Sequence, residues 1–175
     1  FWLGVWQLIY LTVQQEVLIV SPADVAHRIF ELSQSSSFWL TALYSMLRVL
    51  EGFAFGILIG TLLAVLTSAS QMMFDIFHPI ISIIKATPVA SFIILALVWI
   101  QSDHIPAFTS FLMVTPIVWS NVTNGIQKTD PRLLQMAHCY RFGAWKTVRR
   151  VYIPSVMPYF TAACTTGLGL AWKAG

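Results

Sequence analysis

The sequence predicts an all-α membrane protein, and three observations support this fold class. Hydrophobic residues make up 57% of the 175 residues and charged residues only 10%, against about 25% charged residues in soluble domains. The mean hydropathy is +0.74. Several apolar runs reach the roughly 20 residues that a helix needs to cross a bilayer core of about 30 Å. A chain of this composition has too little polar surface to cover a soluble core.

Apolar segments follow one another along the chain and are the expected spans. The first, residues 1–13, is shorter than a full span as given. Four are long enough and hold one charge or none: Val49 to Ala69, Ile80 to Ile100, Ile105 to Ile126 and Val151 to Ala171. We therefore expect about five transmembrane helices in one domain, residues 1–175. Because the chain begins inside one apolar run and stops just after another, we expect this domain to be incomplete at both ends.

The basic residues predict the orientation of these spans. Six of the ten Lys and Arg residues lie between Lys128 and Arg150, and loops rich in Lys and Arg face the cytoplasm. Residues 128–150 are therefore predicted to be cytoplasmic. Alternation then places residues 14–37 outside, where Ser21 and Pro22 are typical of a helix start and predict a short helix to about Leu32.

Two features inside the spans indicate packing or a solute pathway. Gly52, Gly56 and Gly60 recur every four residues, so that another backbone can approach one helical face closely. The approaching helix belongs either to the same subunit or to a second one. Lys85 lies five residues after Ile80, where it either snorkels to the inner surface or serves as a counter-ion for an anionic solute.

Prolines interrupt three of the expected spans. Pro88, Pro116 and Pro158 each remove a backbone hydrogen bond and favour a kink. Kinked helices line the pathways of many transporters, but they also occur as simple adaptations of packing.

The segment that follows Lys128 predicts a short helix at the membrane surface. Asp130 is a good N-cap, and Pro131 suits the first helical position because proline has no N–H to leave unpaired. Leu133, Leu134 and Ala137 share one helical face and can fill a hydrophobic groove on a partner.

Residue types that anchor interfaces follow this helix. They are Arg141, Phe142 and Trp145,. In the alternative interpretation the apolar face of the helix lies on the protein's own spans, while the remaining basic side chains touch lipid phosphates. Those side chains are Lys146, Arg149 and Arg150.

The same segment resembles the cytoplasmic motif of the permease subunits of ABC importers. That motif has an E-A-A triplet, three residues and a glycine, and later an I-x-L-P-like ending. Residues 135–137 (QMA) stand at the triplet, and residues 151–154 (VYIP) stand at the ending. Two positions differ, because Gln135 replaces the glutamate and Arg141 stands at the glycine position, with Gly143 two residues later. Residues 45–53, 85–88 and 167–174 also resemble the nitrate, sulfonate, taurine and bicarbonate branch of this family.

The resemblance implies a helical bundle like that of type I ABC importer permeases. Such a subunit moves a small solute across the cytoplasmic (inner) membrane without an ATPase site of its own. The implied partners are a cytoplasmic ATP-binding subunit, an extracytoplasmic solute-binding protein and a second copy of the permease. Lys85 is then the expected pathway residue. The expected ATPase-coupling residues are Leu133, Leu134, Gln135, Ala137, Arg141, Phe142, Gly143, Trp145 and Pro154.

Other functions have less support in the sequence. An ion-gradient-driven secondary transporter is the main alternative, but it needs cation-coordinating groups at mid-membrane and often shows inverted repeats, and neither is clear here. A third possible function is that of a membrane scaffold or assembly subunit without a solute pathway of its own. Enzyme motifs such as H-E-x-x-H and G-x-S-x-G are absent from the sequence,. Because His138 and Cys139 would point about 100° apart on a helix, we expect no metal site. The basic residues lie beside apolar spans rather than in a solvated domain, so we expect no nucleic acid partner. We also expect no cofactor and no enzymatic activity.

Overall fold

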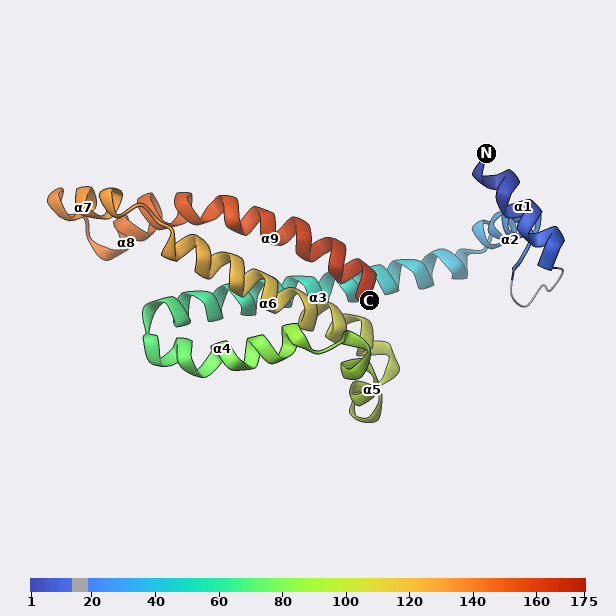
Figure 1. Ribbon diagram of the computed structural model, residues 1–175, viewed down its shortest axis with the longest axis horizontal. Helices are drawn as coiled ribbons and strands as arrows, with labels where there is room; N and C mark the ends of the chain where they lie inside the picture. Colours follow the sequence, from blue (N-terminus) through green and yellow to red (C-terminus); the bar gives the residue numbers. More distant parts are fainter. Residues whose placement is uncertain (14–18) are drawn as a thin grey trace. The chain divides into compact units, whose positions relative to one another are not determined.

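The computed structural model describes residues 1–13 and 19–175, and within these ranges every regular element is helical (Figure 1). The helices are α1 (Trp2–Val13), α2 (Pro22–Ser33), α3 (Ser36–Ala69), α4 (Gln71–Ala86), α5 (Val89–Trp99), α6 (Ile105–Gln127), α7 (Pro131–Cys139), α8 (Ala144–Thr147) and α9 (Ile153–Ala174). A 3₁₀ turn, Ser102–His104, precedes α6, and a π-helical turn, Val148–Tyr152, joins α8 to α9. The chain forms two compact units, Phe1–Ser45 and Met46–Gly175. The predicted all-α class is confirmed.

The first unit contains α1, α2 and the beginning of α3. Ser21 caps α2, because its hydroxyl accepts a hydrogen bond from the Asp24 N–H at 3.1 Å and donates one to the Asp24 carboxylate at 2.7 Å. Pro22 occupies the first position of the helix, where its missing N–H costs nothing. The predicted helix from about Pro22 to Leu32 is thus confirmed. Residues 14–18 of the predicted outer segment lie outside the described residues.

Helix α6 is the central helix of the second unit. The Ser110 hydroxyl donates to the Ala171 carbonyl at 3.3 Å, and Gly125 lies against Tyr159, so α9 packs along α6 in the opposite direction (Figure 1). Helix α3 packs on another side of α6 and runs in the same direction, because Gly52 lies against Ala107 near the start of α6 and Gly60 lies against Val118 further along. As a result α6 is the most buried of the described helices.

Small residues produce the close approach of α3 to α6. The buried small residues of α3 are Gly52, Gly56, Gly60 and Ala64. A Cβ added to Gly52 would meet the carbonyl oxygen of Ala107 and would lie 2.8 Å from its carbonyl carbon. A Cβ on Gly56 would lie 2.7 Å from the Cβ of Val114. Because lipid tails are as apolar as leucine, contact between helices depends on such van der Waals fit rather than on exclusion of water.

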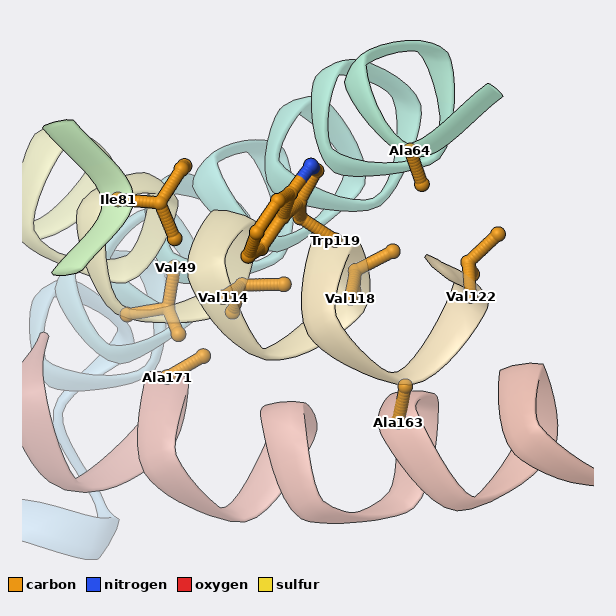
Figure 2. Close-up of a cluster of buried hydrophobic side chains, with 9 residues drawn as sticks. All are labelled: Val49, Ala64, Ile81, Val114, Val118, Trp119, Val122, Ala163 and Ala171. Atoms are coloured by element: carbon orange, nitrogen blue, oxygen red, sulfur yellow. The ribbon is translucent and has the colours of Figure 1, made fainter. Parts of the chain in front are cut away.

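The buried side chains of the core gather around α6 (Figure 2). Val114, Val118 and Val122 come from α6, whereas Ala163 and Ala171 of α9 point toward that helix in the figure. At these two positions the alanines leave room for the β-branched side chains of α6, while Phe160 of α9 packs against the same cluster.

Trp119 ties three helices together at one end of this core. Its indole N–H donates to the Thr67 hydroxyl of α3 at 2.9 Å. Its ring stacks on Phe74 of α4, with 5.9 Å between the ring centroids. The indole thereby satisfies its donor while burying an apolar body, which favours the observed turn from α3 into α4.

The predicted span from Ile80 to Ile100 is wrong as a single helix. Helix α4 begins at Gln71 and ends at Ala86, and α5 is bent by 101° relative to it. Pro88 has no N–H to continue the helix, and Thr87 before it has an extended ψ of 131°, as residues before proline usually do. The kink expected at Pro88 is therefore a complete break, whereas Pro116 and Pro158 lie inside continuous helices.

The described helices differ in their suitability as spans. Helix α3 and the stretch Ser102–Gln127 are long and apolar enough to cross a bilayer, and α4 with α5 adds a third if the bent pair forms one broken span. Helix α9 has a sufficient length of 22 residues but is less apolar. The protein is therefore a multi-pass membrane protein, and the total of about five spans stays a prediction.

Helix α7 ends at a residue with left-handed backbone. Arg141 has a φ of 51°, the only positive φ among the described non-glycine residues. Its N–H donates to the His138 carbonyl, and the Phe142 N–H donates to the Ala137 carbonyl, each at 2.9 Å. These are the two bonds of a Schellman motif, whose left-handed position glycine usually occupies because a Cβ is unfavourable there.

The α3–α6 contact generates a first prediction. In Gly52→Ala the new methyl group meets backbone atoms of Ala107, so the two helices must separate, and we expect unfolding in detergent to be easier by about 1–3 kcal/mol. Gly169→Ala on α9 is the matched control, because among the described residues no heavy atom lies within 4 Å of that Cβ position. Thermal unfolding followed by circular dichroism measures both variants, and equal stability of the two would contradict the contact.

The end of α7 generates a second prediction. Arg141→Gly removes the unfavourable left-handed Cβ and should stabilise the turn by about 1 kcal/mol. Hydrogen exchange at the amides of residues 141 and 142 should slow roughly fivefold.

Gln135→Gly in the middle of α7 is the control, because glycine in a helix interior costs about 1 kcal/mol and should speed exchange instead. Equal effects of the two substitutions would show that the backbone conformation at residue 141 is not the cause.

Candidate functional site

The predicted cytoplasmic segment begins with a tightly fixed turn between α6 and α7. Thr129 is buried, and its hydroxyl donates to the Gly125 carbonyl at 3.1 Å. The Asp130 carboxylate accepts a hydrogen bond from the Arg132 N–H at 2.8 Å, and Pro131 takes the first helical position. The predicted cap is confirmed, and it holds the start of α7 directly on the end of α6.

Helix α7 has one buried face and one exposed apolar face. Ala137 is only 2% exposed, and α7 contacts the π-helical turn of its own chain. Leu133, Met136 and Tyr140 are 40%, 42% and 71% exposed, and their spacing of three and four residues places them on a common side of the helix. We call these three residues the exposed face of α7. It offers an apolar surface at the end of the bundle.

The segment after α7 continues without interruption into α9. Ala144 to Ala174 is helical throughout, with α8 followed by the π-helical turn and then by α9. Pro154 lacks the N–H that would bond one turn back to the Arg150 carbonyl. The Ser155 hydroxyl donates to a different carbonyl, that of Val151, at 2.8 Å. Missing donors of this kind favour local widening of a helix. Helix α7 contacts this turn, so it lies against the first part of the continuous helix that includes α9.

Aromatic and basic side chains surround the junction between α7 and α8. The Lys146 ammonium lies 4.2 Å from the centroid of the Phe142 ring, within the range of a cation–π interaction. Trp145 is 76% exposed. The junction therefore adds an exposed indole in the segment that follows α7.

The structure divides the predicted coupling residues by their burial. The exposed ones are Leu133, Gln135, Arg141, Gly143, Trp145 and Pro154, the half-buried ones are Leu134 and Phe142, and Ala137 is buried. On the predicted face of Leu133, Leu134 and Ala137, only Leu133 is exposed. Met136 and Tyr140, at helical spacing from Leu133, are exposed with it and are not among the predicted coupling residues.

Lys85 lies at a second location, the break between α4 and α5. A cavity of about 410 Å³ is lined there by Lys85, Thr87 and Pro88 together with Met113 and Pro116 of α6. The Thr87 hydroxyl donates to the Ile83 carbonyl at 2.8 Å. Among residues 1–13 and 19–175, no carboxylate lies within 4 Å of the Lys85 ammonium.

Neither location has the composition of a metal centre. In the part of the chain that the structure describes, no three His, Cys, Asp or Glu side chains gather in a way that could hold a metal ion. The two locations offer an interaction surface and a hollow with one cation.

Comparison with known proteins connects this geometry to a family. The family model of the binding-protein-dependent transport system inner membrane component matches residues 56–175. This range includes α6, the whole segment from α7 to α9, and the break that holds Lys85. It covers well over half of the chain.

Individual relatives are similar at low identity. The nitrate import permease protein NrtB of Synechocystis sp. is 24% identical over 133 residues, which cover 74% of this chain and 48% of that protein. The bicarbonate transport system permease protein CmpB of Synechocystis sp. is 24% identical over 139 residues, which cover 78% and 49%. The nitrate import permease protein NrtB of Leptolyngbya laminosa is 24% identical over 185 residues, which cover 98% and 64%.

The chain thus spans about half the length of the first two relatives. The family match, the names of these permeases and the apolar helices agree with one another. The chain belongs to the binding-protein-dependent transport system inner membrane components, the permease family of ABC importers.

Proposed function

We propose that this chain is the membrane-spanning core of a permease subunit that carries a small solute across the cytoplasmic membrane while a separate subunit hydrolyses ATP. Family membership supports the transport class. The names of two relatives, one for nitrate and one for bicarbonate, support a small anion as the solute. In this proposal the helical bundle forms the solute path, and ATP hydrolysis by the separate subunit supplies the energy for transport.

The exposed face of α7 is the observation that carries this proposal. Leu133, Met136 and Tyr140 present apolar side chains outward, while Ala137 on the other side is held by the chain itself. A short amphipathic helix of this kind fits a hydrophobic groove on a partner. Tyr140 and Trp145 are the residue types that contribute most binding energy at interfaces, and we assign them as anchors for the ATP-binding subunit.

The other predicted coupling residues would position this surface. Arg141 forms the left-handed end of α7, and Gly143 precedes α8. Pro154 accompanies the π-helical turn, and Phe142 holds Lys146. Leu134 and Gln135 flank the exposed face on α7. In this proposal the ATP-binding subunit moves α7, and the continuous helix from Ala144 passes that movement into the bundle.

The remaining parts of the proposal follow from charge and family. The cluster of basic residues supports a cytoplasmic location for residues 128–150, and residues 14–37 then face outward and can meet an extracytoplasmic solute-binding protein. A second copy of the permease completes the path. The subunit would have no ATPase site of its own.

Reconstitution tests the transport class. Sealed vesicles containing the full-length permease, the ATP-binding subunit and the binding protein should take up solute only with ATP, and uptake should persist when ionophores dissipate ion gradients. Uptake that continues without ATP and collapses with the gradient would favour a secondary transporter. Absence of uptake with all partners present would favour a scaffold.

The docking surface generates a third prediction. Tyr140→Ala and Trp145→Ala each remove an exposed anchor, and we expect the affinity of the full-length permease for the ATP-binding subunit to fall at least about tenfold, since anchors of this type contribute about 2 kcal/mol or more. Surface plasmon resonance measures the affinity. Trp172→Ala removes an equally large, exposed side chain from the far end of α9 and should leave the affinity unchanged.

Because both anchors are exposed, neither substitution should alter thermal unfolding. Wild-type affinity in both anchor variants would exclude the exposed face of α7 as the docking site.

A further inference from the structure

Lys85 lies much deeper in its helix than its position in the sequence indicated. Helix α4 begins at Gln71, so Lys85 is 14 residues along, about 21 Å at 1.5 Å per residue. The hydrocarbon core of a bilayer is about 30 Å thick. The first two turns of α4 carry Asp75 and His78, so the start of the helix does not by itself fix the depth of Lys85 in a bilayer.

The neighbouring helix gives an independent measure of this depth. The cavity around Lys85 is also lined by Pro116 and its neighbours on α6. Pro116 is the twelfth of the 23 residues of that helix. The lining residues of α6 therefore place the cavity near the middle of the bundle, where an unneutralised ammonium group is costly,.

The cavity has the chemistry of a site for one negative charge and a small apolar body. Lys85 supplies the positive charge, and no described carboxylate neutralises it. Leu112, Met113 and Ile117 supply apolar walls, and Thr87 lines the same cavity while its hydroxyl donates to the Ile83 carbonyl.

We propose that this cavity is a binding site for a small organic anion, with the charged group at Lys85 and the apolar part against α6. The inference rests on the proposed transport function, because it identifies the part of the solute path in which the solute is held. An alkylsulfonate or a short carboxylate has the required chemistry. The volume of about 410 Å³ lies within the usual range of small-molecule pockets, roughly 300–1,000 Å³.

Thiol labelling tests the site without any partner or ATP. In the full-length permease with Cys139→Ser and Cys164→Ser, Thr87→Cys places a thiol in the cavity. We compare its reaction with 2-sulfonatoethyl methanethiosulfonate, itself a small alkylsulfonate, and with the 2-(trimethylammonium)ethyl reagent. The ratio of the anionic to the cationic rate should fall roughly tenfold when Lys85→Gln is added, as expected for one unit charge within about 10 Å. Lys85→Arg should preserve the ratio.

Two further positions keep the labelling result interpretable. Ile83→Cys lies on the same helix but outside the cavity lining and is exposed, so lipid should keep it unreactive toward both reagents. Val89 also lines the cavity, so Val89→Cys should give the same result as Thr87→Cys. It tests the site independently if Thr87→Cys folds poorly. A rate ratio at both cavity positions that does not depend on residue 85, or cavity thiols that react with neither reagent, would overturn the site.

Transport then separates this site from the proposed function. In the reconstituted importer, Lys85→Gln should lower uptake of an anionic solute at least tenfold at low concentration, with affinity for the ATP-binding subunit unchanged, whereas Lys173→Gln should transport normally. Wild-type uptake in Lys85→Gln would overturn the anion site while leaving the importer assignment intact. Failure of the wild type to show ATP-driven uptake would instead count against the proposed function, and the labelling result would still decide the site.

Discussion

The second unit depends on the close approach of two helices to α6. Glycines on α3 let their backbone reach Ala107 and Val114, and alanines on α9 do the same on another side (Figure 2). Within a bilayer there is little hydrophobic gain from bringing helices together, so this fit of small residues supplies much of the attraction. These contacts position α3 and α9 around α6. The Trp119 hydrogen bond to Thr67 then fixes the adjoining end of α3 and the turn into α4.

Two structural consequences follow from the central position of α6. At one end, the buried Thr129 and the Asp130 cap lead directly into α7, so α7 is attached to α6 through a short turn. At the other end of residues 128–150, the chain is helical without a break from Ala144 into α9. A force on α7 must therefore reach both helices of the most extensive packed pair in this unit. In the proposed mechanism this double attachment converts movement of a partner into movement of the bundle.

The break at Thr87 and Pro88 gives the same bundle its second special location. A continuous helix would satisfy its backbone groups internally, whereas a break leaves polar groups that need water, protein or a solute in a membrane. Here the break faces the middle of α6 and carries Lys85. The proposed anion site and the proposed docking surface thus share α6 as a common neighbour. Bound solute and attached partner would act on the same helix, although they contact different residues.

Local patterns in the sequence determined much of this protein: apolar runs predicted an all-helical membrane bundle, and Ser21 and Asp130 predicted helix starts that the structure contains. These features follow from residue type and helical period, which act within a few residues. Helical spacing groups Leu133 with Met136 and Tyr140, but local patterns do not tell which side of α7 is free. Ala137 is buried, and α7 contacts a turn that begins eleven residues after Ala137. The depth of Lys85 likewise depends on where α4 begins and on its neighbour Pro116. Tertiary structure alone decided both, since burial and depth are set by contacts between distant segments.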